Sequence, residues 1–353
     1  MRVKSLKKTL ENSDIDAYLV TDTKNVYYFT GFRDISEATL NLLITPEDES
    51  ILLVSQLSLS AANKNAKNCS VRGVYFGEKI INKLIDLIKK LGAKTIHFDN
   101  LSSKTYIEIT ERLDTNFVPN PELVMDLRRV KDETELAHIR KACKLATIGI
   151  QAGIEAIKPG VKEYEIAAVM EYAMRAMGSE GASFETIVAS GPRSAYPHGL
   201  ANNRMIKKGD LVTIDLGATY AGYCSDITRT VVASEPSPKQ SRILNLVFRA
   251  QGEAFQKFCA GAKAKDVDAS ARNVLTDGGY GKYFIHGLGH GVGLSVHESP
   301  VLSPSSEDIL EEGNVVTNEP GVYIEGFGGV RIEDMVLIRK NRVERLTVAP
   351  YYL

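Results

Sequence analysis

Short apolar runs alternate with amphipathic stretches along the first 120 residues of this chain. Runs of strand length predict four strands, at residues 17–21, 39–45, 51–55 and 95–98. Residues 77–91 instead repeat Ile and Leu at helical spacing, which predicts a helix. This mixture predicts an α/β layered domain. Pro119 and Pro121 interrupt regular structure, so we place the end of the domain at residue 121.

Longer helical patterns follow these prolines. The pattern at 133–157 stops before Lys158-Pro159-Gly160, a combination that terminates helices. Further helices are predicted at 163–177, 238–260 and 264–276, and strands at 211–215, 226–232 and 330–336. Because a length of 353 residues suits two domains, we expect a second, α+β domain over 122–353 after the domain over 1–121.

Four carboxylates and one imidazole in the C-terminal half stand in local contexts that would bring them toward one point. They are Asp215, Asp226, His290, Glu319 and Glu333. Four carboxylates cannot share a pocket as anions without countercharge, because like charges a few ångströms apart force some of them to hold protons. Two divalent cations would balance the four charges. The pattern therefore indicates a dinuclear metal site.

The spacing of the first two aspartates supports this interpretation. A two-residue turn centred on Tyr220 and Ala221 would place Asp215 directly opposite Asp226 in a hairpin. Opposed side chains in such a pair have Cβ atoms about 4.5 to 5.5 Å apart, so the two charges would repel unless a cation lay between them. The alternative is a longer turn with both aspartates in solvent.

The other three candidates lie in separate motifs. Glycine alternates with larger residues around His286 and His290, which excludes a helix and the helical histidine pair of zinc proteases. Glu319 follows an apolar run and falls at a strand end. Alternation along 330–336 puts Arg331 and Glu333 on one face of a strand, where a surface ion pair is the alternative.

With these five residues in this order, the chain resembles the pita-bread metallopeptidases, which include methionine aminopeptidase, aminopeptidase P and prolidase. The resemblance begins near Leu123, and the preceding part is similar to the creatinase-type domain of prolidases and aminopeptidases P. It implies an α/β N-terminal creatinase-type domain plus an α+β pita-bread catalytic domain. It also implies the ligand roles. Asp215 would bind one metal, His290 and Glu319 the other, and Asp226 and Glu333 would bridge them.

This donor set is rich in oxygen, which suits Mn, Co or Fe(II) and also allows Zn. Two metal ions about 3.5 to 4 Å apart can bridge a water, lower its pKa and polarise the scissile carbonyl. The family analogy makes Glu319 the acceptor of the water's proton.

The resemblance also implies roles for residues around the metals. His198 and His297 match histidines that in relatives contact the substrate carbonyl and the tetrahedral intermediate, where donated hydrogen bonds stabilise developing charge. His286 matches a position near the proline-side pocket, and Arg331 an arginine that orients the site. Tyr323 is a further substrate-binding candidate, with a core position as the alternative.

A full N-terminal domain favours the proline-directed branch of the family. The implied reaction is hydrolysis of the Xaa-Pro bond in dipeptides. Some prolidases carry an arginine that grips the dipeptide carboxylate, but Val301 stands at that position here. Aminopeptidase P activity on longer peptides that begin Xaa-Pro therefore stays open. A metal-free binding protein or a creatinase-like hydrolase is less favoured, because such relatives lose ligand residues.

Composition narrows the partners. A net charge of -1 argues against nucleic acid and anionic membranes as partners, and no run of about 18 apolar residues predicts a membrane span. Four isolated cysteines and a charged N-terminal start favour a cytoplasmic location. The resemblance implies a homodimer and a proline-containing peptide as substrate. The aromatic run Tyr27 to Phe32 is a candidate dimer contact, with a core position as the alternative.

Overall fold

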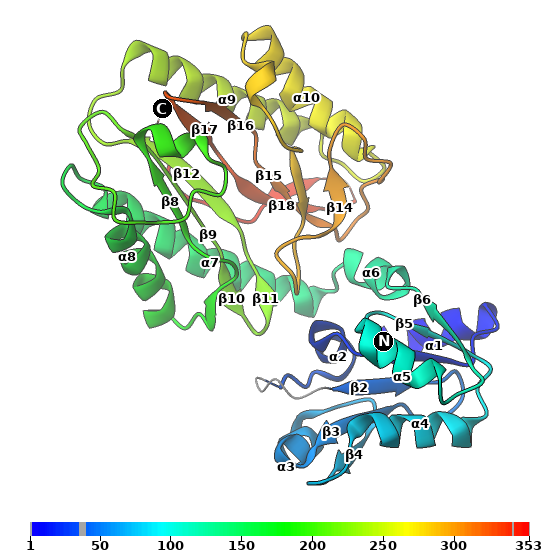
Figure 1. Ribbon diagram of the computed structural model, residues 1–353. Helices are drawn as coiled ribbons and strands as arrows, with labels where there is room; N and C mark the ends of the chain where they lie inside the picture. The colour runs from blue at the N-terminus through cyan, green and yellow to red at the C-terminus, as the bar shows by residue number, and fades with distance from the viewer. Residues whose placement is uncertain (1, 35–39, 341, 353) are drawn as a thin grey trace. The chain divides into compact units, whose positions relative to one another are not determined.

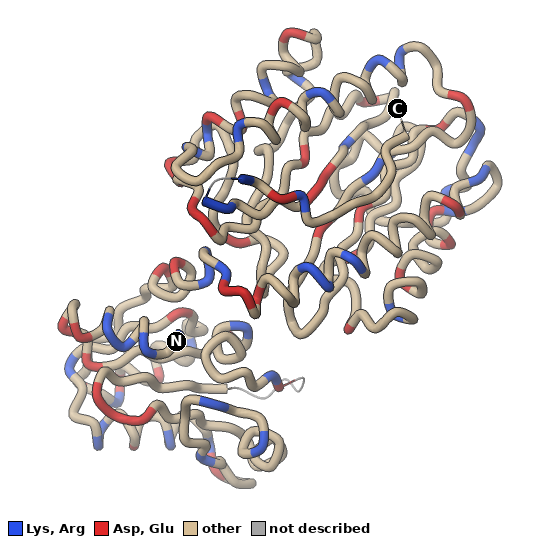
Figure 2. Tube along the Cα trace, turned by 180° about the vertical axis from the view of Figure 1, so that it is seen from behind, with Lys and Arg blue, Asp and Glu red and all other residues tan. Residues whose placement is uncertain are grey.

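The computed structural model describes residues 2–34, 40–340 and 342–352. The chain divides into two compact units, Met1–Arg128 and Arg129–Leu353 (Figure 1). Helix α6 (Glu122–Arg129) belongs almost entirely to the first unit. The boundary at residue 121, predicted from Pro119 and Pro121, assigns this helix to the second domain instead. Acidic and basic residues are interspersed along both units (Figure 2).

The first unit is built on a six-stranded sheet with the order β4-β3-β2-β1-β5-β6. Its strands are β1 (Ala17–Val20), β2 (Asn41–Ile44), β3 (Ile51–Ser55), β4 (Ser70–Val74), β5 (Thr95–Phe98) and β6 (Asn116–Pro119). The pairs β1–β2 and β2–β3 are antiparallel, and the other three pairs are parallel. All four predicted apolar runs contain a strand, although residue 39 lies outside the described residues.

Helices accompany this sheet: α1 (Arg2–Asn12), α2 (Thr23–Thr30), α3 (Gln56–Asn65), α4 (Ile80–Leu91) and α5 (Ser103–Thr110). Helix α4 forms inside the predicted range 77–91 and ends at Gly92, which adopts a left-handed φ of 64°. The aromatic run lies on α2 and just after it. Tyr28, Phe29 and Phe32 are buried there, so these rings belong to the core of this unit.

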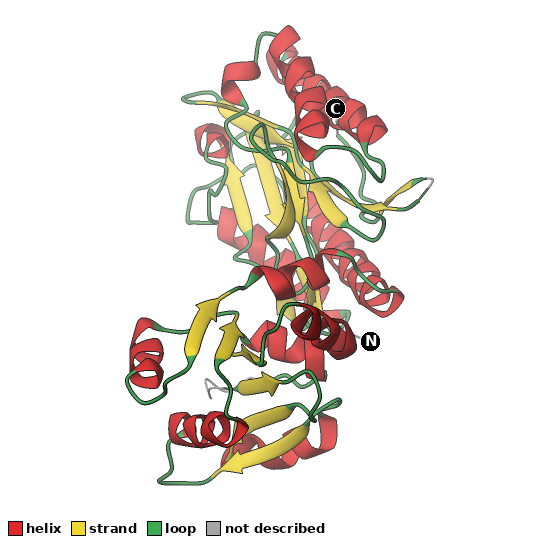
Figure 3. Ribbon diagram, turned by 90° about the vertical axis from the view of Figure 1, so that its right-hand side faces the viewer, coloured by secondary structure: helices red, strands yellow, loops and turns green. Residues whose placement is uncertain are grey.

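The second unit places its strands between two pairs of long helices (Figures 1 and 3). The helices are α7 (Glu133–Ala156), α8 (Glu163–Ala176), α9 (Pro238–Lys257) and α10 (Ala264–Asp277), and each forms within three residues of its predicted bounds. Helices α7 and α8 pack on one apolar core that includes Ile214 and Ile227. Helices α9 and α10 pack on another that includes Val316 and Val336. The strands therefore carry polar side chains between two apolar layers.

Three sheets form most of this central layer. One has the order β12-β9-β8, from β12 (Ile227–Val232), β9 (Leu211–Leu216) and β8 (Ile187–Ser190). Another has the order β14-β13-β15-β18-β19, from β14 (Glu298–Leu302), β13 (Gly289–Gly291), β15 (Val315–Asn318), β18 (Asp334–Ile338) and β19 (Val343–Arg345). A third pairs β16 (Gly321–Ile324) with β17 (Gly328–Arg331).

Short elements complete the unit: β7 (Gly181–Ala182), β10 (Ala218–Tyr220), β11 (Tyr223–Cys224) and the 3-10 turns η1 (Gly191–Ala195) and η2 (Gly281–Tyr283). Within the described part of the chain, no helix has the length and apolar character needed to cross a membrane.

The predicted hairpin register is wrong by two residues. Asp215 pairs with Thr228, and Tyr220 pairs with Tyr223. The turn is centred on Ala221 and Gly222, whose φ values of 48° and 76° are both positive, as a tight hairpin turn of this length requires.

The single strand predicted at 330–336 is also wrong, because β17 ends at Arg331 and β18 begins at Asp334. Between these strands, the N–H of Glu333 donates to the carbonyl of Thr228 at 3.1 Å. The chain thus leaves its pairing with β16, contacts the β12 sheet, and then pairs with β15.

Candidate metal and catalytic site

The structure gathers the predicted ligands from separate elements of the second unit. Asp215 lies on β9, Asp226 directly before β12, His290 on β13, Glu319 directly after β15 and Glu333 directly before β18. The Nε2 of His290 lies 3.2 Å from Glu319 Oε1 and 3.8 Å from Asp226 Oδ2. One ligand atom each from Asp226, His290 and Glu333 fall within 4.8 Å of one another. A single metal ion could therefore contact all three side chains.

Burial and mutual repulsion govern the charges in this cluster. Burial, followed by repulsion from Glu333 and Asp215, raises the pKa of Asp226 well above its usual range. Burial and the charges of Glu319 and Asp215 do the same to the pKa of Glu333. Burial also raises the pKa of Asp215, although Arg331 opposes this effect. The raised pKa values show that the protein alone disfavours full ionisation of these carboxylates. The sequence argument predicted this result, because it held that four carboxylates need added countercharge.

Glu319 and His290 behave as an ion pair within the cluster. Burial raises the pKa of Glu319, but the hydrogen bond and charge of His290 oppose it and bring that pKa to about 2. Burial lowers the pKa of His290, yet Glu319 reverses the effect, so the pKa of the imidazole is raised overall. Glu319 is thus the carboxylate most firmly held as an anion.

Orphaned oxygens test whether metal ions fit these residues. Oδ1 of Asp215, Oδ1 of Asp226 and Oε1 of Glu333 are buried and have no hydrogen-bond partner among the described residues. A buried polar atom without a partner costs about 1 to 3 kcal/mol, and more when it carries charge. Hard divalent cations would satisfy carboxylate oxygens of this kind. The residues therefore fit divalent metal ions.

Two threonines that the sequence interpretation missed hold the carboxylates. Thr228 Oγ1 donates to Glu333 Oε2 at 2.6 Å. Thr317 Oγ1 donates to Glu319 Oε1 at 3.0 Å and accepts the backbone N–H of His290 at 3.0 Å. Each threonine stands two residues from a candidate ligand, a spacing that puts strand side chains on one face, so alternation was the signal that could have found them.

Arg331 connects the cluster of candidate ligands to Tyr323. It is 4% exposed, so the alternative of a surface ion pair with Glu333 is excluded. Its Nη2 donates to Asp215 Oδ2 at 2.6 Å, its Nε to Thr228 Oγ1 at 3.1 Å and its Nη1 to Tyr323 Oη at 2.8 Å. The guanidinium therefore fixes one candidate ligand directly and another through a threonine.

Tyr323 and His286 form the next layer. Tyr323 Oη lies 3.0 Å from Nε2 of His286. Burial raises the pKa of Tyr323 to about 12, against the opposing charge of Arg331, and burial lowers the pKa of His286. A neutral phenol and a neutral imidazole thus lie beside the charged cluster. Tyr323 is buried, which agrees with the alternative of a core position, but its hydroxyl also contacts His286 and Arg331.

His198 and His297 are exposed to solvent. The ring of His297 meets that of His290 edge-on with centroids 4.2 Å apart. Burial and the charge of His290 lower the pKa of His297, and the opposing charge of Glu319 only partly offsets them. His198 follows Pro197, whose carbonyl accepts Arg331 Nη1 at 3.2 Å. Both histidines are therefore accessible, with His297 against His290 and His198 directly after the residue that accepts a hydrogen bond from Arg331.

Val301 occupies the position where the resemblance places a carboxylate-binding arginine in some prolidases. It pairs with His290 across β13 and β14, and its side chain is 47% exposed. An apolar group therefore lies beside a candidate ligand on an accessible surface.

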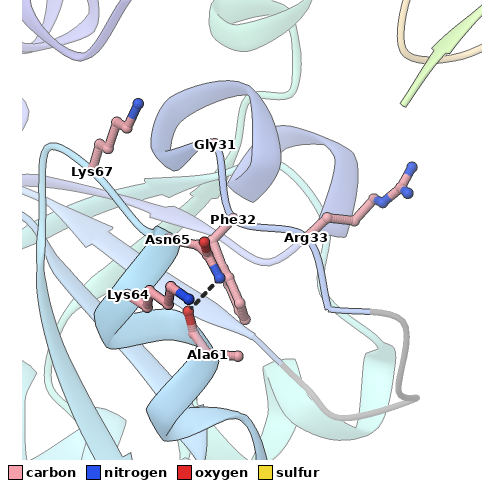
Figure 4. A pocket seen from close by; sticks show the side chains of 7 residues that line it. All are labelled: Gly31, Phe32, Arg33, Ala61, Lys64, Asn65 and Lys67. Atoms are coloured by element: carbon pink, nitrogen blue, oxygen red, sulfur yellow. Dashed lines mark hydrogen bonds between the residues drawn. The ribbon is translucent and has the colours of Figure 1, made fainter. Parts of the chain in front are cut away.

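A pocket of about 500 Å³ in the first unit is a different kind of feature (Figure 4). Its charged lining residues are Arg33, Lys64 and Lys67, and none of its seven lining residues is an acid, a histidine or a cysteine. Asn65 uses its amide within helix α3, donating to the carbonyl of Ala61 at 2.9 Å. The described lining of the pocket therefore offers no carboxylate, imidazole or thiol for hydrolysis.

Comparisons with known proteins identify the family and agree with the fold. Residues 137–340 match the model of metallopeptidase family M24, and residues 2–130 match the creatinase/prolidase N-terminal domain. The chain belongs to metallopeptidase family M24. The predicted class of enzyme and the fold class, a creatinase-type domain followed by a pita-bread catalytic domain, are confirmed. The family implies divalent metal ions and a peptide substrate.

Particular relatives cover nearly the whole chain. A Xaa-Pro dipeptidase from Pyrococcus furiosus is 41% identical over 98% of this chain and 97% of its own length. The crystal structure of a prolidase from Pyrococcus horikoshii has a TM-score of 0.94 at 40% identity, covering 99% of both chains. An X-Pro aminopeptidase from Thermotoga maritima has a TM-score of 0.91 at 35% identity, covering 99% of this chain and 98% of its own.

Proposed function

We propose that this protein hydrolyses the Xaa-Pro bond of dipeptides with the help of two divalent metal ions. The buried cluster of carboxylates carries the proposal, because three of its oxygens lack partners among the described residues. Similarity to Xaa-Pro dipeptidases over nearly the full chain supports the choice of substrate. Mn, Co or Fe(II) suits the donor set, and Zn is also compatible with it. A homodimer in the cytoplasm belongs to the same proposal.

The residues that would hold the metal ions follow the family pattern. Asp215 would hold one ion, His290 and Glu319 the other, and Asp226 and Glu333 would be shared between the two. The strong electrostatic interaction between Asp226 and Glu333 supports a shared position. When bound, the metal ions lower the pKa of a water and polarise the scissile carbonyl. Asp226, Glu333 and Asp215 then balance the added positive charge.

Glu319 is our candidate for the proton acceptor. Its low pKa keeps it an anion throughout the neutral range. Oε1 already accepts the hydroxyl of Thr317 and lies against His290, so we assign the transferred proton to Oε2. Arg331 acts indirectly, holding Asp215 and Thr228 in place.

His198 and His297 act on the substrate. Both are accessible, and both are expected to donate N–H groups to the carbonyl oxygen as it gains negative charge. One such donor is commonly worth about 2.7 to 4 kcal/mol of transition-state stabilisation. His286 and Tyr323 form the wall on the proline side of the substrate, with the His286 ring held by the Tyr323 hydroxyl. Because the proline nitrogen carries no N–H, the scissile amide requires no hydrogen-bond acceptor from that wall.

Aminopeptidase P activity is the second candidate. The exposed Val301 beside His290 offers no cation to a dipeptide carboxylate, which favours substrates that continue beyond proline. The likeness to the Thermotoga maritima X-Pro aminopeptidase supports it as well.

An assay on metal-reconstituted protein separates the candidates. Ala-Pro, Ala-Pro-Ala and Ala-Ala are each offered to protein loaded with Mn²⁺, and bound metal is counted by elemental analysis. Cleavage of Ala-Pro alone supports the dipeptidase, whereas preferred cleavage of Ala-Pro-Ala supports the aminopeptidase. Two bound ions without cleavage of either proline peptide would refute the proposal.

A matched pair of variants tests the site itself. Asp215→Ala should abolish turnover while the protein stays folded, because it removes a proposed ligand and the partner of Arg331. Asp266→Ala removes an exposed aspartate from helix α10 and should leave turnover unchanged. Equal turnover by the two variants would remove Asp215 from the site.

A further inference from the structure

A buried lysine–glutamate pair lies next to His297 in the sequence. Lys131 is 4% exposed, and its Nζ lies 2.9 Å from Oε1 of Glu298. The same Nζ donates to the carbonyl of Arg129 at 3.3 Å. Glu298 begins β14 and directly follows His297, whereas Lys131 comes two residues before helix α7. Burying two charges costs several kcal/mol of desolvation per ion, so stability alone is a weak explanation for such a pair.

The carboxylate of Glu298 shapes the loop that carries His297. A Cβ atom on Gly293 would overlap Oε1 of Glu298, so the carboxylate occupies the space of a side chain at that position. Oε2 accepts the backbone N–H of Ser295 at 3.4 Å. Across the strand pair, Gly291 is the partner of Glu298, next to an irregularity that follows His290. The segment 291–298 therefore folds back over a single buried carboxylate.

This carboxylate is the direct chain neighbour of His297. Glu298 points inward to Lys131, whereas His297, in the bend just before β14, is exposed and meets the ring of His290. A shift of Glu298 would therefore move His297 as well. Neither Lys131 nor Glu298 is among the five candidate ligands. Lys131 also lies outside both segments that match the family models, 2–130 and 137–340.

We propose that Lys131 and Glu298 are positioning residues, whose ion pair holds the segment 291–298 so that His297 can reach the substrate oxygen. This inference rests on the role proposed above for His297. Lys131 supplies the countercharge that lets Glu298 stay buried, and Glu298 fixes the loop. Without Lys131, the carboxylate turns toward water and carries the histidine out of place.

Lys131→Met tests the proposal through kcat. A displacement of about 1 Å at a reacting group can lower the rate by about 10²-fold, and we expect a loss of this order with unchanged metal content. In a His297→Ala background, the same substitution should lower kcat by less than about twofold, since its effect passes through the missing imidazole. An equal loss in both backgrounds, or no loss in the wild-type background, would overturn the proposal.

Two controls keep the test independent of folding. Lys83→Met removes an exposed lysine that pairs with Glu78 at 2.8 Å in the first unit, and it should leave kcat unchanged. If Lys131→Met does not fold, Lys131→Met/Glu298→Gln removes both charges and leaves no unpaired ion, so it should fold. That double variant should show the same dependence on His297. A full wild-type kcat would contradict the proposal.

Histidine-selective NMR gives a readout that does not need activity. The ring signals of His297 are identified by their loss in His297→Ala, and Lys131→Met should shift them while Lys83→Met does not. Unshifted signals would overturn the positioning role. A wild-type protein that cleaves no proline peptide would refute the proposed function alone, because the NMR result stands apart from turnover.

Discussion

Thr228→Val removes one hydroxyl from beneath the candidate metal site. Thr228 is 0% exposed, and its Oγ1 donates to Glu333 Oε2 at 2.6 Å and accepts Arg331 Nε at 3.1 Å. Valine has nearly the same shape but can do neither. Glu333 would then have two buried oxygens without donors, since its Oε1 already lacks a partner among the described residues.

The size of the effect follows from these contacts. A hydrogen bond to a charged group contributes about 1.5 to 3 kcal/mol. The hydroxyl is also one of the groups that hold down the pKa values of Glu333 and Asp215, so its loss raises both further. Ligands must lose protons to bind metal, and removing a group that supports a ligand commonly weakens metal affinity about 10- to 100-fold. We expect a loss in this range, larger at about pH 6 than at about pH 8.

Isothermal titration with Mn²⁺ at both pH values measures this loss. Thr228→Ser is the matched control, because it keeps the oxygen and removes only a methyl group, and it should bind metal nearly as the wild type does. The reasoning fails if the valine variant binds Mn²⁺ like the serine variant, or if its deficit is the same at both pH values.

Two further predictions concern stability. Glu163 is fully buried, accepts the N–H and hydroxyl of Ser190 at 2.8 and 2.7 Å, and pairs with Arg193. Glu163→Ala should therefore lower the free energy of unfolding, measured by urea denaturation, by about 3 to 5 kcal/mol. A loss below about 1 kcal/mol would contradict this prediction. The hydrogen bond from Arg140 lowers the pKa of Glu344 below its usual value, so the pair stabilises the fold above the unfolded-state pKa and loses this effect as pH falls through the folded-state value. Glu344→Gln should therefore cost about 0.5 kcal/mol near neutral pH and nothing in acid, and a deficit that persists in acid would be inconsistent with an ionic origin.

Helices were predictable because their signals are local. Helix α7 begins after Asp132, whose side chain accepts the backbone N–H of Glu135. In return, the side chain of Glu135 accepts the backbone N–H of Asp132. Its end precedes Pro159-Gly160, where a helix cannot continue. Both signals lie within a few residues of the boundaries that they determine, so no knowledge of tertiary contacts was needed.

Strand register was missed for one local and one non-local reason. The turn at Ala221 and Gly222 puts a glycine at one of its two positions of positive φ, a local signal that the predicted turn at Tyr220 and Ala221 left unused. The break after Arg331 depended on the bond between Glu333 and Thr228, more than a hundred residues earlier in the chain. The types of the candidate ligands could be read from the sequence, and alternation could have pointed to the threonines. That Thr228 holds Glu333, which comes from a distant part of the chain, became evident only with the structure.

The repulsion between carboxylates that favours a bound cation does not arise where the predicted hairpin placed it. Asp226 does not face Asp215, yet its pKa is still raised well above the usual range, first by burial and next by Glu333. Glu333 comes from the other sheet, brought there by its backbone bond to Thr228. The repulsion is therefore created where two sheets meet, and a slip within one hairpin leaves it in place. This explains why a wrong register led to the same expectation of metal, since the excess of buried carboxylates survives any local rearrangement that keeps both sheets together.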